Sequence, residues 1–184
     1  MTKRTAAPAA GTPDLLRLTT SAVVTALIFL FTFLVKVPTG VGYIHLGDAF
    51  VLLYAAATGD PLALFAGALG EALADIAGGY APYAPVTAVI KVLIALPVVL
   101  SVRRERGAGT RPSDRKLLTR NTFLWSLLSV PVTLGGYFLI DYALSGAYAF
   151  PALWTNGVQA AGSVLLFAVL GAAFDRSSLS KRLR

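Results

Sequence analysis

Long stretches without any charged side chain most constrain how this chain can fold. Leu18–Val35, Asn121–Ile140 and Ala152–Phe174 are 18, 20 and 23 residues long and contain no Asp, Glu, Lys or Arg. A helix of about 20 apolar residues crosses the hydrocarbon core of a bilayer. Charged residues make up 14% of the chain, against about 25% in soluble domains, and the mean hydropathy is +0.71. The sequence predicts an all-α integral membrane protein.

Two further stretches complete the predicted spans. Pro85–Val102 is apolar apart from Lys91, whereas Ala49–Ala77 is interrupted by Asp60-Pro61. Fourteen of the 16 Lys and Arg residues cluster before the first span, after Pro85–Val102, and at the C-terminus. Because cytoplasmic segments carry the excess of Lys and Arg, we expect all three clusters to be cytoplasmic. Ala49–Ala77 then crosses an even number of times, as two short helices.

The sequence therefore predicts a six-transmembrane-helix bundle with both termini in the cytoplasm. The expected organisation is a flexible N-terminal tail at 1–17, a six-helix membrane domain at 18–174 and a basic C-terminal tail at 175–184. Pro, Gly and Asp separate the basic start of the chain from its first apolar run, unlike the arrangement in a signal peptide. We expect that run to be a retained helix.

The connections expected on the outer side are rich in glycine, proline and tyrosine. The first, residues 36–47, carries three glycines and one proline, and it is either a plain loop or a mobile lid. Tyr43 and Tyr83 lie in these connections, where tyrosine either anchors a helix at the membrane interface or contacts a ligand.

Polar residues on four of the predicted helices lie at a similar depth, in the outer half of the membrane. At 1.5 Å per residue, Lys91 and Glu71 lie about 9 Å below the outer helix ends, with Asp75 nearer the surface. Asn156 and Gln159 share one helical face, and Tyr137 falls in the same layer. Such side chains face the interior of a bundle. They either line a pocket or form internal contacts, for example between Lys91 and Glu71 or Asp75.

Three other residues near this layer each have two interpretations. His45 is either a structural histidine or a ligand contact, Asp48 either caps the helix that follows or binds a ligand, and Trp154 either stacks on a flat ring or anchors at the interface. Ala22 and Ala26, four residues apart, permit close approach of another helix.

Several kinds of site are missing from the sequence. The chain has no GxxxxGK[ST] loop for ATP, no Gly-x-Ser-x-Gly nucleophile motif, no cysteine and a single histidine. We therefore expect no catalytic residue, no metal site and no cofactor in this chain. Six helices without a visible inverted repeat are few for a self-sufficient transporter, which indicates a binding subunit that needs partners.

Three segments resemble the substrate-binding S components of energy-coupling factor (ECF) vitamin transporters. These are GYIHLGDAFVLLYAA at Gly42–Ala56, GALGEALADIAGGYAPYAPVTAVIK at Gly67–Lys91 and TNGVQAAG at Thr155–Gly162. The chain is most similar to the branch assigned to hydroxymethylpyrimidine, pyridoxine-like and riboflavin-like substrates. The resemblance implies a six-helix bundle in a prokaryotic plasma membrane, with a pocket open to the outside and closed by the loop before the second helix.

The resemblance also implies a function and partners. The chain would capture a small vitamin or precursor for uptake, with a hydroxymethylpyrimidine- or pyridoxine-like heterocycle favoured and riboflavin or pantothenate as alternatives. It would dock through Ala22 and Ala26 onto a membrane T component, and two ATPase subunits would use the ATP. The expected substrate-binding residues are Tyr43, His45, Asp48, Glu71, Asp75, Tyr83, Lys91, Tyr137, Trp154, Asn156 and Gln159.

Two other functions fit the same residues. In one, the polar layer only locks helix packing in a structural membrane protein that has no ligand. In the other, Glu71 and Asp75 act as acid and base in an intramembrane enzyme.

Overall fold

The computed structural model describes residues 15–40, 42–108 and 116–177. Helix α1 (Leu15–Phe33) leads into a two-stranded antiparallel hairpin, β1 (Lys36–Pro38) and β2 (Tyr43–His45), in which Lys36 pairs with His45. The remaining elements are helical and follow in the order α2 (Gly47–Thr58), α3 (Leu62–Ala77), η1 (Ala81–Tyr83), α4 (Ala84–Gly107), α5 (Arg120–Ser126), α6 (Ser129–Ser145), η3 (Gly146–Tyr148) and α7 (Ala149–Arg176). Most residues of the tails expected at 1–17 and 175–184 lie outside the described ranges.

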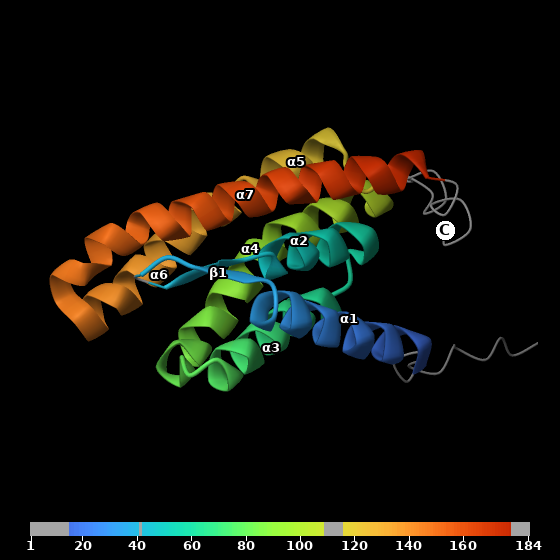
Figure 1. The fold of residues 1–184 in the computed structure, drawn as a ribbon. Coiled ribbons are helices and arrows are strands. Elements are labelled where there is room, and N and C mark those ends of the chain that lie inside the picture. Colours follow the sequence, from blue (N-terminus) through green and yellow to red (C-terminus); the bar gives the residue numbers. More distant parts are fainter. Residues whose placement is uncertain (1–14, 41, 109–115, 178–184) are drawn as a thin grey trace, which may run out of the picture.

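The helices form one bundle whose two ends are built differently (Figure 1). The β hairpin, η1 and the turn between α6 and α7 lie toward the left of the view, whereas α1 begins and α7 ends on the right. The turn between α2 and α3 and the end of α4 also lie on the right. We call these the hairpin end and the basic end, because the three arginines Arg17, Arg103 and Arg106 lie at the latter.

The turn expected at Asp60-Pro61 separates α2 from α3, as predicted. Gly59 ends α2 in the left-handed conformation (φ 55°), which glycine adopts at low cost. The Asp60 carboxylate then accepts a hydrogen bond from the backbone N–H of Leu62 (3.0 Å), at the start of α3. At 12 and 16 residues, both helices are short.

The helical stretch expected at 121–140 is present but is interrupted by a turn at Leu127 and Leu128, which was not predicted from the sequence. Helix α5 ends at Ser126 and α6 begins at Ser129. Pro131 explains the break, since it has no N–H to donate to the carbonyl of Leu127 and its ring would clash there. The Val130 N–H bonds to Leu127 instead (3.2 Å), in a tighter turn.

The interior is apolar and the outer surface is apolar as well. Ile28, Leu52, Ile94, Val98 and Phe167 are fully buried and belong to one core cluster. Large apolar side chains are also exposed on the outside, among them Val23, Phe65, Leu69, Leu139 and Leu165. Such a surface is unfavourable in water and suits lipid.

Three helical stretches among the described residues are long and apolar enough to cross a membrane: 15–33, 81–107 and 120–176. The last contains α6 and α7, which pack against each other as an antiparallel hairpin (Figure 1). The protein is therefore an all-α membrane protein with several spans and one small β hairpin.

Candidate functional site

A cavity at the hairpin end lies between the β hairpin and helices α3, α6 and α7. It is lined by seven of the eleven residues predicted to bind substrate: Tyr43, His45, Asp75, Tyr83, Tyr137, Asn156 and Gln159. The volume is about 70 Å³, room for a few water molecules. Pockets for drug-sized ligands are larger, about 300–1,000 Å³. The cavity is smaller than such pockets, and residues of the β hairpin form part of its wall.

A buried ion-pair cluster lies beneath the cavity. The Lys91 ammonium group donates to Asp48 Oδ1 (2.5 Å) and lies 3.0 Å from Glu71 Oε2. None of these side chains is more than 3% exposed. Burying charge costs several kcal/mol per ion unless a partner is present, so each of the three groups depends on the others. We call Asp48, Glu71 and Lys91 the charged base.

Asp48 is therefore an ion-pair partner rather than a helix cap. It lies in the first turn of α2, but the N-cap residue is Leu46 and no side-chain capping bond is present there. Of the two partners expected for Lys91, Glu71 is in contact with it. The other contact is made by Asp48 and not by Asp75.

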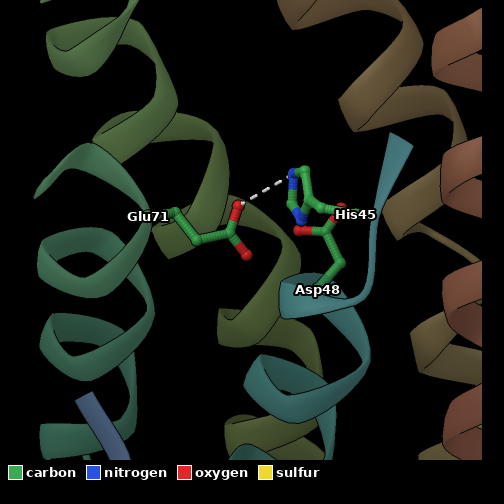
Figure 2. Close-up of side chains that lie close together, drawn as sticks. All are labelled: His45, Asp48 and Glu71. Carbon is green, nitrogen blue, oxygen red and sulfur yellow. Dashed lines mark ion pairs between the residues drawn. The ribbon is translucent and has the colours of Figure 1, made fainter. Parts of the chain in front are cut away.

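His45 connects the hairpin to the charged base (Figure 2). Its ring points at the Glu71 carboxylate, with Nε2 3.5 Å from Oε2. The backbone N–H of Gly47 lies 3.1 Å from Nδ1, and the Gln159 side-chain nitrogen lies 3.0 Å from Nε2, so both ring nitrogens have a polar partner. Burial lowers the pKa of His45 to about 4, although the nearby Asp48 acts in the opposite direction. The ring is therefore neutral at pH 7.

His45, Asp48 and Glu71 present ligand atoms within 4.8 Å of one another, close enough to hold a cation. The Lys91 ammonium already lies between the two carboxylates and supplies the positive charge that they need. A divalent ion would have to approach this ammonium closely, against strong repulsion. The donor set therefore suits lysine better than a metal, and the expectation of no metal site stays a prediction.

Gln159 joins three elements at the side of the cavity. Its Nε2 donates to Asp48 Oδ2 on α2 (3.1 Å), and its Oε1 accepts from the backbone N–H of His45 on β2 (3.3 Å). Gln159 is only 4% exposed. One amide on α7 thus fixes the closed hairpin and the charged base at the same time.

Asp75 and Asp141 present two further carboxylates to the cavity. Asp75 accepts hydrogen bonds from the hydroxyls of Tyr43 (2.8 Å) and Thr87 (2.5 Å). Asp141 accepts one from the Tyr83 hydroxyl (2.8 Å). The Tyr83 hydroxyl thus connects η1 to α6 at the cavity wall.

Sequence reasoning missed Asp141, Tyr80, Thr155 and Ala152, which also line the cavity. Asp141 carried a usable signal, since it lies four residues after Tyr137 and therefore on the same face of α6. Thr155 begins the TNGVQAAG segment, and Tyr80 lies in a tyrosine-rich connection, but neither feature separates a cavity residue from its neighbours.

Four predicted substrate-binding residues do not line the cavity. Asp48, Glu71 and Lys91 form the charged base below it, and Trp154 is 78% exposed on the outer surface of α7. Trp154 lies two residues before Asn156, about 200° around the helix, so the two side chains point in different directions.

The small residues divide into two groups. Ala66, Gly70 and Ala74 are buried, and α3 packs closely on α1, where a Cβ at Gly70 would lie 2.9 Å from the Thr25 carbonyl oxygen. Ala22 and Ala26 are exposed on α1. They remain available for another helix.

Together these features define a class of protein. It is a helical membrane protein with several spans, and it encloses a polar cavity near one end whose side chains are suited to hydrogen bonding rather than to covalent chemistry.

The profile of the family described as ECF-type riboflavin transporter, S component, matches residues 14–175, and the chain belongs to this family. No curated protein matches the chain in sequence. The protein is thus the substrate-binding component of an ECF transporter, which binds a vitamin for uptake and is not an enzyme. The family confirms the resemblance found in the sequence. It excludes the two alternatives considered there, a structural protein without a ligand and an intramembrane enzyme.

Proposed function

We propose that the cavity binds an uncharged or cationic nitrogen heterocycle that carries hydroxyl groups. The observation that carries this proposal is the composition of the wall, which has four tyrosines, two amides and two carboxylates but neither lysine nor arginine. Flat rings gain from aromatic contact, and amides suit the alternating donors and acceptors of a heterocycle. Riboflavin, named in the family's description, is the first candidate. Pyridoxine and hydroxymethylpyrimidine are smaller candidates of the same type.

Pantothenate fits this wall poorly. Its carboxylate would lie beside Asp75 and Asp141, and the lysines nearest the wall, Lys36 beside Tyr43 and Lys91 beside Tyr137, are not among the described residues that line the cavity. Lys91 is fully buried and already paired with two carboxylates, so it is not free to bind a third. A negatively charged ligand would therefore be desolvated without compensation.

The expected roles follow from position. Asn156 and Gln159 donate and accept hydrogen bonds along one edge of the ring, while Tyr43, Tyr83 and Tyr137 supply contact area. His45 adds its ring to the cavity wall, and Asp75 accepts from ligand hydroxyls or amines. The charged base orients Gln159 through Asp48 rather than touching the ligand.

Entry requires the hairpin to move. Three contacts hold it closed: Tyr43 to Asp75 (2.8 Å), the His45 N–H to Gln159 (3.3 Å) and the Thr155 hydroxyl to Thr39 (3.3 Å). A ring the size of isoalloxazine needs far more than the present 70 Å³. We therefore assign the hairpin the role of the lid, one of the two interpretations of residues 36–47.

Calorimetric titration of the purified protein with riboflavin, pyridoxine, hydroxymethylpyrimidine and pantothenate tests the proposal. We expect one heterocycle to bind and pantothenate not to bind. Asn156→Ala and Gln159→Ala should weaken binding tenfold or more, since each leaves buried polar groups unpaired (about 1–3 kcal/mol). Asn121→Ala, at the basic end, is the control. Tightest binding of pantothenate, or full affinity in both cavity variants, would refute the assignment.

We also propose six membrane crossings, made by α1, α2, α3, α4, the α5–α6 pair and α7, with both termini in the cytoplasm. Successive helices run between the hairpin end and the basic end (Figure 1). The arginines at the basic end support a cytoplasmic location for that end, in a prokaryotic plasma membrane. The cavity then opens to the outside.

The partners that we propose are a membrane T component and two ATPase subunits, which would use the ATP. The exposed pair Ala22 and Ala26 supports a docking surface on α1. Replacing both with leucine should abolish vitamin uptake by cells that contain the whole transporter and leave vitamin affinity unchanged. Ala143→Leu, on an exposed face of α6, is the control. Normal uptake by the double variant would exclude this surface.

A further inference from the structure

A second cavity lies at the basic end of the bundle, remote from the vitamin site. It has a volume of about 360 Å³ and is lined by Arg17, Arg103 and Arg106, together with the α2–α3 turn at Gly59, Asp60 and Pro61. It thus joins the beginning of α1, the turn between α2 and α3, and the last turns of α4.

The charges of this cavity are unbalanced. Arg17 is paired with the Asp60 carboxylate, which fixes one wall. Arg103 and Arg106 are exposed, and no carboxylate of the residues that the structure describes lies within ion-pair distance of either. Three arginines against one aspartate leave a net charge of +2 around the hollow. The ligand is therefore expected to be an anion, and guanidinium groups match the geometry of phosphate oxygens.

Apolar side chains flank the arginines. Leu18, next to Arg17 on α1, is 49% exposed, and Phe65, one turn beyond Pro61 on α3, is 65% exposed. A ligand that reaches both the arginines and these side chains carries a phosphate and hydrocarbon together. We propose that the cavity at the basic end binds the phosphate headgroup of an anionic membrane lipid, whose acyl chains lie along α1 and α3.

The position of the cavity favours a lipid over an acidic segment of a partner protein. The arginines lie at the ends of helices whose apolar surfaces face lipid, which is the level of the headgroups. The inner leaflet is rich in anionic lipid, and each nearby arginine adds to the attraction. The wall is hollowed to 360 Å³, a size suited to a compact headgroup.

Mixed micelles of stated composition provide the test. The full chain is purified in detergent and titrated with phosphatidylglycerol or phosphatidylcholine, while bound lipid is counted by native mass spectrometry and the unfolding temperature is recorded. We expect phosphatidylglycerol to bind and to raise the unfolding temperature, and phosphatidylcholine to do neither. The Arg103→Gln/Arg106→Gln double variant should lose about 30-fold in affinity, on the scale of membrane-surface arginines.

Arg104→Gln is the matched control, because Arg104 is an exposed arginine of the same helical turn that does not line the cavity. An equal loss in this variant would show that bulk charge, not the cavity, attracts the lipid and would overturn the proposal. Inorganic phosphate giving the same stabilisation as the lipid would overturn it in favour of a free anion. Unchanged lipid binding in the double variant, with loss of ATPase-subunit or T-component binding instead, would identify a protein interface.

Discussion

At the scale of single residues, Lys91 is the fully buried cation on which the charged base depends. Its ammonium group lies 2.5 Å from an Asp48 carboxylate oxygen and 3.0 Å from a Glu71 carboxylate oxygen. Because no solvent reaches this cluster, removal of the cation leaves Asp48 and Glu71 repelling each other in a poorly polarisable environment.

We expect Lys91→Met to lower the free energy of unfolding by about 3–5 kcal/mol, the usual cost of breaking a buried ion pair. Adding Asp48→Asn and Glu71→Gln should restore much of the loss, since the variant then has no uncompensated charge. Denaturant unfolding in detergent measures both. Lys116→Met, at an exposed position, is the control and should unfold like the original protein. An unaltered unfolding curve for Lys91→Met would show that the cluster is solvated.

The lowered pKa of His45 predicts that the free energy of unfolding depends on pH. Its folded-state pKa, about 4, lies below the ordinary value of 6.5, so the unfolded chain takes up a proton first as the pH falls. The contribution of the neutral His45 ring to the free energy of unfolding is complete above pH 6.5. It is lost as the pH falls toward 4, on the order of 1.4 kcal/mol per pH unit within this window.

The chain has only one histidine, so no other imidazole contributes to the pH dependence. As the pH is lowered from 7 to 5, the free energy of unfolding should fall more steeply for the original protein than for His45→Gln. Parallel pH profiles for the two proteins would mean that His45 does not titrate differently on folding.

At the scale of elements, the sequence predicted helices better than their interruptions. Basic clusters and Asp60-Pro61 were sufficient to divide α2 from α3, because charge location and proline have direct physical meanings. The break before Pro131 was missed because the run from Asn121 to Ile140 has no charge and was interpreted as one helix, although Pro131 was an available signal. The strands of the hairpin, three residues each, are too short to produce an alternating pattern.

The polar layer was located by helical rise alone, and seven of its predicted members line the cavity. Sequence could not separate the lining from the charged base, because Glu71 and Asp75 share one face of α3 yet differ in depth by one turn. Trp154 faces outward, which fits the interface anchor that was one of its two interpretations; depth alone could not separate it from Asn156, because the two differ in angle around α7.

The packing of α1 on α3 gives a prediction for Gly70. Any side chain there would meet the Thr25 carbonyl oxygen and Ile28 Cγ2, both 2.9 Å from an added Cβ. We expect Gly70→Leu to separate the two helices and to destabilise the protein by about 1–3 kcal/mol, as overpacking does. Gly135→Leu on α6 is the control, since a Cβ there meets nothing within 4 Å. Equal unfolding temperatures for the two variants would refute close packing at Gly70.

At the scale of the whole molecule, the proposed six crossings assign each connection to one side of the membrane. The chain has no cysteine, so single cysteines can report on sidedness. In intact cells, an impermeant maleimide should label Ala81→Cys and Ala147→Cys at the hairpin end, but not Pro61→Cys or Ala108→Cys at the basic end. All four positions are exposed. After permeabilisation all four should react. External labelling of Pro61→Cys would exclude two crossings by α2 and α3.

The charged base and the cavity wall lie in separate layers, and this separation bears on how such a protein changes its cargo over evolutionary time. Stability is expected to depend on Asp48, Glu71 and Lys91, whereas Tyr83 and Asn156 belong to the wall. Replacing Tyr83 or Asn156 removes no ion pair of the charged base, so the fold is expected to tolerate it; Gln159 and His45, which contact the base, are the exceptions. One fold can in this way become specific for a new vitamin through a few substitutions in the cavity wall, while the charged base and the proposed docking surface on α1 stay the same.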